Sequence, residues 1–182
     1  GHLPRQDPDP GTGRAQRSPH RRHRFGKVHA GARRDHSPGA AAATGNVLWF
    51  VHADTRVSED HEQKVAWATA HAWGGRWGRF DVRIDSADRM LALVGRMMNW
   101  RSRWSGVATG DQAIFVSRIL FERVGGFPEL PLMEDIALSK RLRCASSPAC
   151  LGPPVLTSAR RWEKDGKWRT IALMWWLRGA YF

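Results

Sequence analysis

The chain has 182 residues, which is enough for one domain with a sizeable core, and its formal net charge is +12. This excess of Lys and Arg favours an anionic partner, such as phosphate groups, a membrane surface or nucleic acid. Two cysteines are too few for a disulfide framework, and no apolar run reaches the ~20 residues of a membrane span or resembles a signal peptide. We therefore predict free thiols and a reducing, cytoplasmic location.

The first 38 residues differ in character from the rest. They contain five Pro, five Gly, five His and eight Arg, with few large apolar side chains and no helix or strand period. Such a segment cannot bury enough apolar surface to offset the entropy of ordering it. We predict either a disordered basic tail or a segment that is not native to the domain, as translation of a GC-rich gene in the wrong frame would produce.

From Gly39 onward the pattern alternates between strands and helices. A helix end near Thr44 is followed by the continuous apolar run 47–51, which predicts a buried strand. Further along, acidic first turns, periodicity and glycine stops predict helices and strands in alternation. The expected helices are 58–73, one capped by Ser86, 121–124, 134–144 and 168–181; the expected strands are 80–84, 113–116 and 153–157.

Two groups of acidic residues occupy positions where α/β proteins bind ligands. His52-Ala53-Asp54 directly follows the strand at 47–51, and a carboxylate there can hold a divalent cation on a diphosphate. Glu134 and Asp135 begin a helix, where one carboxylate can serve as a general base. A turn residue and a favourable interaction with the helix dipole are the plain structural alternatives for these two groups.

Two further motifs complete the set of candidate site residues. Asp111 and Gln112 lie in a Gly-Asp-Gln segment before the strand at 113–116, where a simple turn is the structural alternative. Arg161 and Trp162 follow the last predicted strand, where a solvated basic pair with one core aromatic is the alternative.

Taken in order, these strings resemble family 2 glycosyltransferases of the GT-A fold, an α/β fold with a Rossmann-like mixed sheet flanked by helices. The wording is most similar to the radical-SAM/selenodomain-associated transferase subgroup. The resemblance covers residues 39–182 and is carried by VLWFVHADT, GRFDVRID, ATGDQAIFV, GGFPELPLMEDIALSKRLR and RRWEKDGKWRT. Five ordered strings are more specific than any one motif.

The resemblance implies a role for each candidate. Asp54 holds Mg²⁺ or Mn²⁺ and Asp135, beside Glu134, is the base that deprotonates the acceptor hydroxyl. The substrate-binding residues are His52, Asp111, Gln112, Arg161 and Trp162. The Gln of the processive enzymes' Gln-x-x-Arg-Trp motif is replaced by Ser158, which argues against processive synthesis.

The implied activity is metal-dependent, inverting transfer of a sugar from a nucleotide-diphosphate sugar, such as a UDP-sugar, to an unidentified hydroxyl acceptor. A lipid-linked acceptor and peripheral contact with the inner face of the membrane are compatible with this activity, and no nucleic-acid partner is expected. The family's first strand and nucleotide-gripping turn should precede Gly39, and neither is recognisable there. The sequence therefore predicts a GT-A domain that is incomplete at its N-terminus, with a strand at 47–51 that lacks a neighbour.

Three alternatives remain open from the sequence. The chain is an inactive transferase fragment, a basic protein that binds a membrane surface through the Trp-rich 168–178 region or binds nucleic acid, or a nucleotidyltransferase of related sheet architecture. Metal-dependent nucleotide binding that requires Asp54 would separate a transferase from a purely charge-driven binder, whose affinity falls steeply with salt.

Overall fold

The computed structural model describes residues 25–30, 37–70, 76–130, 132–160 and 162. The predicted helix at 168–181 and the candidate Arg161 lie outside this part of the chain. The described elements, in chain order, are β1 (Phe25–Ala30), α1 (Ser37–Ala42), β2 (Val47–His52), β3 (Thr55–Arg56), α2 (Glu59–Ala70), β4 (Trp77–Asp85), α3 (Arg89–Ser105), the 3-10 turn η1 (Gly110–Gln112), β5 (Phe115–Ser117), α4 (Arg118–Arg123), α5 (Glu134–Ala145) and β6 (Ala149–Ser158).

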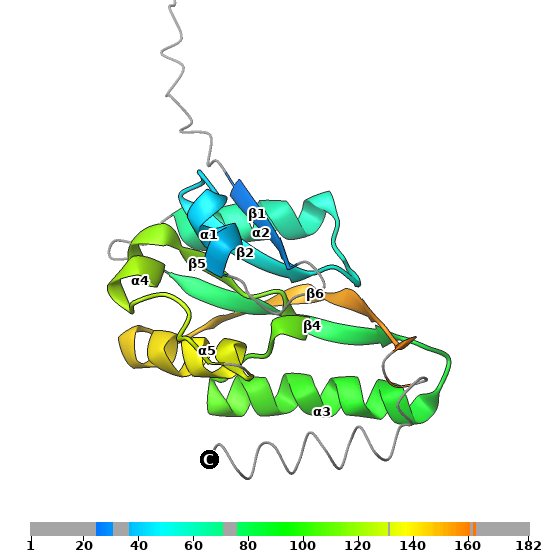
Figure 1. Cartoon of the computed structure of the whole chain (residues 1–182). Helices are drawn as coiled ribbons and strands as arrows, with labels where there is room; N and C mark the ends of the chain where they lie inside the picture. Colours follow the sequence, from blue (N-terminus) through cyan, green and yellow to red (C-terminus); the bar gives the residue numbers. More distant parts are fainter. Residues whose placement is uncertain (1–24, 31–36, 71–75, 131, 161, 163–182) are drawn as a thin grey trace, which may run out of the picture.

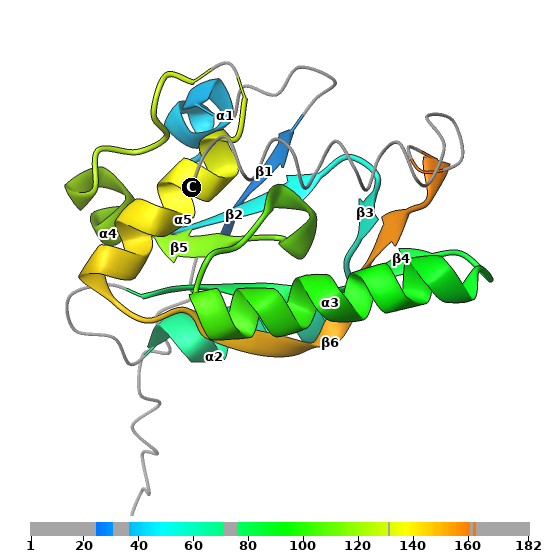
Figure 2. The same cartoon turned by 90° about the horizontal axis from the view of Figure 1, so that it is seen from below.

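The strands form one mixed six-stranded sheet in the order β1-β2-β5-β4-β6-β3. The pairs β1–β2 and β4–β6 are parallel, whereas the pairs β2–β5, β5–β4 and β6–β3 are antiparallel. Helices lie on both sides of the sheet, with α2 on one side and α3 running along β4 on the other (Figures 1 and 2). The predicted class, an α/β sheet flanked by helices, is confirmed at this level.

The alternation of β2 explains why both faces of the sheet are covered. Leu48 and Phe50 pack in one core cluster with residues of α1, α4 and α5. Val47, Trp49 and Val51 point to the other face and pack in a second cluster, which includes Val65 of α2. A strand buried on both faces reads as a continuous apolar run, which is what the sequence shows at 47–51.

One expectation from the sequence is wrong. A strand, β1, forms inside the segment predicted to contain none, and it pairs along its whole length with β2, from Phe25 opposite Val47 to Ala30 opposite His52. The predicted strand at 47–51 therefore has neighbours on both sides, β1 and β5. The physical reason is that pairing with an already buried strand satisfies the backbone of β1, which its own weak pattern does not reveal.

The start of α3 also differs from the expectation. Ser86 was the predicted cap, but the N-cap is Asp88, whose carboxylate accepts a hydrogen bond from the backbone N–H of Met90. The Ser86 hydroxyl instead accepts from the backbone N–H of Asp88. Both residue types favour caps, so sequence alone does not choose between positions two residues apart.

Asn99 anchors α3 to the sheet and links it to η1. Its side-chain amide donates to the carbonyl of Val82 at 2.9 Å, and its amide oxygen accepts from the N–H of Val82 at 2.8 Å. The amide thus takes the place of a strand partner for Val82 on β4. The same oxygen lies 3.5 Å from Nε2 of Gln112 in η1, so the turn that carries Asp111 is tied to the helix layer.

Candidate functional site

The candidate site lies where the end of β2, the turn η1 and the first turn of α5 meet. Nδ1 of His52 lies 3.3 Å from Oδ1 of Asp111, and the side chains of these two residues are each a little over a quarter exposed. Asp135 accepts a hydrogen bond from the backbone N–H of Gly110, 2.6 Å from its Oδ2. Three segments that are distant in the sequence thus converge on Gly110 and Asp111.

Gly110 permits this convergence because it has no side chain. A Cβ built on Gly110 would lie 2.2 Å from Nε2 of His52, a separation that real Cβ atoms do not show. The His52 ring therefore lies directly against the backbone of Gly110. No other residue type would leave room for both the ring and the turn.

The first turns of α5 hold the loop before η1 through two side chains. Asp135 bonds Gly110, and Ser139, one turn later on the helix, accepts from the N–H of Ala108 and donates to its carbonyl, both at 3.2 Å. Oδ1 of Asp135 accepts from the N–H of Ile136 at 2.7 Å. Side chains at i and i+4 share one helix face, so α5 positions the whole 108–110 segment.

Two non-glycine residues adopt left-handed backbone conformations beside this site. Ala113, with φ 48°, follows η1, and Met133, with φ 64°, directly precedes Glu134. Such conformations cost of the order of 1 kcal/mol each and are concentrated at functional sites. Ala113 directly follows the turn that carries Asp111, and Met133 lies two residues before Asp135.

Burial and neighbouring charges shift the pKa of Asp135. Desolvation by burial raises the pKa of this carboxyl above its usual range, while the hydrogen bonds from Gly110 and Ile136 oppose the shift. The negative charge of Asp111 raises the pKa further, and His52 lowers it. A carboxylate with a raised pKa, held in a cluster of polar side chains, has the properties of a general base.

The pKa of His52 is also raised. Burial, the largest single cause, lowers this pKa, but the hydrogen bond and charge of Asp111 together with the charges of Asp135 and Asp54 outweigh burial. Asp54 is exposed in the turn between β2 and β3 and lies close enough to influence the imidazole electrostatically. His52, Asp54, Asp111 and Asp135 therefore form one electrostatic group, which we call the β2–η1–α5 cluster.

The other sequence candidates lie apart from this cluster or beneath it. Glu134 is partly buried as the first residue of α5. Gln112 is fully buried, and its amide oxygen accepts a hydrogen bond from the N–H of Thr109 at 3.2 Å. Its side chain therefore stabilises the turn from inside the core. Trp162 is buried among Ile84, Leu91 and Ala159 at another part of the core.

Sequence reasoning missed the supporting residues. Gly110 was visible only as a turn residue, and its contact with His52 depends on the approach of another strand. Asn99 and Ser139 lie within amphipathic helices, where a polar residue gives no signal of a special partner. Their roles become apparent only once the helices are packed on the sheet.

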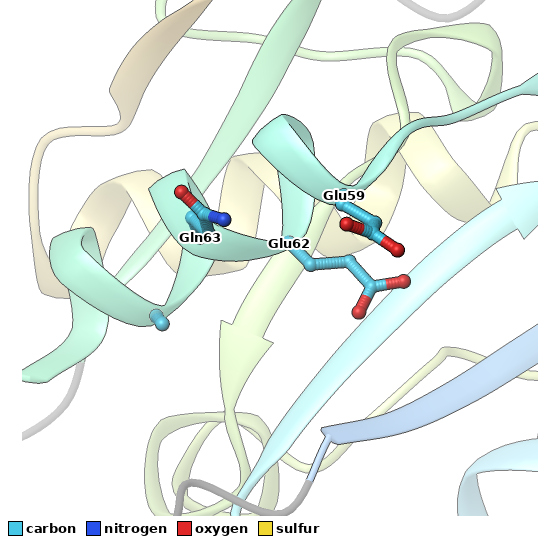
Figure 3. Close-up of a pocket in the computed structure, with 4 residues that line it drawn as sticks. Glu59, Glu62 and Gln63 are labelled. Atoms are coloured by element: carbon cyan, nitrogen blue, oxygen red, sulfur yellow. The ribbon is translucent and has the colours of Figure 1, made fainter.

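Two surface hollows in the described part of the chain border α2, and no residue of the β2–η1–α5 cluster lines either of them. The first is lined by α2 together with Cys150, Leu151 and Gly152 of β6. The second is lined by Glu59, Glu62, Gln63 and Ala66, all from α2 (Figure 3). Because a single helix supplies this lining, no second element positions a ligand there. The described residues hold no group of three or more His, Cys, Asp or Glu side chains that could bind a metal ion by themselves.

The raised pKa of His52 predicts a pH dependence of stability. A folded-state pKa above the ordinary value of about 6.5 means that the folded chain binds the proton more tightly than the unfolded chain. This contribution to the free energy of unfolding is complete below about pH 6.5 and is lost as the pH rises through the folded-state pKa. We expect His52→Gln to flatten this decline in urea titrations at a series of pH values. An equally steep decline in the variant would show that His52 is not its source.

The described part of the chain contains no helix that is both long enough and apolar enough to cross a membrane. The two cysteines, Cys144 and Cys150, are free thiols, as the sequence predicted.

Comparison with protein-family models, with curated proteins and with solved structures gives no match for this chain.

Proposed function

We propose that this chain is a metal-dependent, inverting glycosyltransferase of the GT-A type. It would transfer a sugar from a nucleotide-diphosphate donor, such as a UDP-sugar, to a hydroxyl acceptor. The observation that carries the proposal is the convergence of His52, Asp54, Asp111 and Asp135 from three distant segments. Supporting it is the position of His52 and Asp54 at the carboxyl end of a buried strand, where α/β sheets bind ligands.

Asp135 is the proposed base. The oxygen of the acceptor hydroxyl would form a bond to the anomeric carbon while the bond from that carbon to the diphosphate oxygen breaks, and Asp135 would take the hydroxyl proton. Its backbone hydrogen bonds from Gly110 and Ile136 fix the orientation of the carboxylate, and burial raises its pKa, which strengthens it as a base. Each oxygen of the Asp135 carboxylate accepts one backbone hydrogen bond, so each has a second lone pair that can accept the hydroxyl proton of the acceptor.

Asp54 fits a divalent cation that is shared with a substrate. Mg²⁺ at nucleotide sites is bound by one or two carboxylates plus substrate phosphates, so the exposed Asp54 carboxylate can supply the protein's share of the ligands. When bound, the metal would offset negative charge on the departing diphosphate. A protonated His52, favoured by its raised pKa, would place a further positive charge near the same phosphates.

Calorimetric titration of UDP with and without Mn²⁺ tests the donor site. We expect metal-dependent binding by the unchanged chain, and a loss of at least about tenfold in affinity for Asp54→Asn, because one carboxylate–metal contact is removed. Asp60→Asn is the matched control, since Asp60 is an exposed acid on α2 whose carboxylate lies 3.8 Å from Nζ of Lys64, outside the β2–η1–α5 cluster. Binding that both variants retain, or that needs no metal, would contradict the proposed role of Asp54.

A further inference from the structure

The outer face of α3 carries an exposed apolar stripe. Its members are Leu93, Met97, Trp100 and Trp104, whose exposed fractions are 47%, 49%, 69% and 82%. Successive members are four, three and four residues apart, so the stripe spans only about 60° of the helix circumference. The rings of Trp100 and Trp104 are stacked, with centroids 6.3 Å apart and planes 6° from parallel.

This stripe lies on the side of α3 that faces away from the sheet. The residues that α3 buries are Leu91, Gly95, Met98 and Ser102, which have the same spacing two positions earlier in the chain. A shift of two residues is about 200° of rotation, so the exposed stripe lies opposite the buried one. A helix that only packs on a core has charged and polar residues there.

A line of arginines borders the exposed stripe. Arg89, Arg96 and Arg103 are spaced by seven residues and lie within about 90° of the stripe's centre on one side. All three are exposed, and Arg103 pairs with Asp81 at 2.6 Å. Stacked indole rings beside a row of guanidinium groups match a surface that is apolar inside and anionic outside, as the interface of an anionic bilayer is.

We propose that α3 is a membrane-docking helix, which binds the surface of anionic phospholipid bilayers with the Leu93–Trp104 stripe inserted at the headgroup level. The tryptophans and aliphatic side chains supply the apolar contact, and Arg89 and Arg96 supply attraction to lipid phosphates. The chain's net charge of +12 favours approach to the same surface. This proposal does not depend on the transferase activity.

Figures 1 and 2 place α3 and α2 on opposite sides of the sheet, which supplies an internal control. Trp67 on α2 is 72% exposed, comparable with Trp100 and Trp104, but it lies outside the stripe. A non-specific affinity of exposed tryptophan for lipid would therefore be reduced by Trp67→Ala as well. Docking through α3 would be reduced only by changes on α3.

The test is co-sedimentation of the full chain with vesicles of phosphatidylcholine containing about one third phosphatidylglycerol, compared with phosphatidylcholine alone. We expect binding to the anionic vesicles that falls at least about tenfold in Trp100→Ala/Trp104→Ala. We expect a fall of about fivefold for each of Arg89→Gln and Arg96→Gln, because one basic residue near the surface contributes about that factor. Trp67→Ala should bind as the unchanged chain does.

Three outcomes would overturn the proposal. The first is that the unchanged chain does not sediment with anionic vesicles. The second is equal loss of binding in Trp67→Ala and in the α3 double variant. The third is unaltered binding in the double variant together with a lower melting temperature, which would mean that the stripe is covered within the protein. Circular dichroism of each variant verifies folding, which these exposed side chains are not expected to govern.

Discussion

Asp135→Asn is expected to lower the rate of sugar transfer by about 1,000-fold while leaving UDP binding in place. Asn retains an oxygen that can accept the N–H of Gly110 or Ile136, but it cannot take a proton from an acceptor hydroxyl. The site's geometry is therefore largely preserved while the proposed base is removed. The rate is measured as UDP release from a panel of UDP-sugars with candidate acceptors, and binding is measured by calorimetry in parallel.

Glu134→Gln is the matched control, because Glu134 is the neighbouring carboxylate at the start of α5. If Asp135 is the base, Glu134→Gln should retain most of the rate. The reverse pattern would assign the base to Glu134. Loss of UDP binding together with the rate in Asp135→Asn would instead assign Asp135 a structural role in holding Gly110.

If Asp135 is the base, the same carboxylate also sets the acid limit of the proposed reaction. A base acts only when it is unprotonated, so the rate should fall as the pH drops through the pKa of Asp135. Because burial raises this pKa, the fall should begin at a higher pH than the ordinary Asp range predicts.

Gly78→Ala is expected to destabilise the fold by about 3 kcal/mol or more. Gly78 lies in β4 between two paired strands, opposite Phe115 of β5 and Ala149 of β6. A Cβ there would be 2.3 Å from the carbonyl oxygen of Ala149 and 2.5 Å from Cζ of Phe115. The clash with Ala149 is with backbone in the middle of the sheet, so a side-chain rotation cannot relieve it.

Gly95→Ala provides the comparison for this change. Gly95 lies inside α3, where an added Cβ would be 3.5 Å from the carbonyl oxygen of Val82, an ordinary contact. Because alanine favours helix over glycine by up to about 1 kcal/mol, this variant should be as stable as the unchanged chain or more so. Thermal or urea unfolding measures both, and for a chain of this size 3 kcal/mol corresponds to roughly 6–12 °C. A Gly78→Ala protein that melts like the unchanged chain would contradict the packing at β4.

The strongly patterned elements of this fold were predictable from the sequence. The run at 47–51 gave β2, and the acidic first turns at Glu59 and Glu134 marked the starts of α2 and α5. In contrast, β1 was missed because its existence depends on pairing with β2 and not on its own pattern. The two-residue β3 is also too short to leave a periodic signal.

Part of the site was predictable for a different reason. His52, Asp54, Asp111 and Asp135 were identified as candidates from motif order, and the structure brings them into one cluster. Motif order does not show which way a side chain points, so Gln112 was selected with them although it is fully buried. The fit of His52 against Gly110 follows from the approach of β2 to η1 in space, which spacing along the chain does not encode.

The way in which the β2–η1–α5 cluster is assembled also bears on how the protein folds. His52 and Asp111 are 59 positions apart, and Gly110 and Asp135 are 25 apart, so the cluster closes only after long stretches of chain have been arranged. Contacts of this range form slowly, because the entropy of closing the intervening loops is lost before the contacts stabilise the chain. A molecule bound across the cluster would therefore stabilise the folded sheet as a whole, and its binding would follow the native population through an unfolding transition.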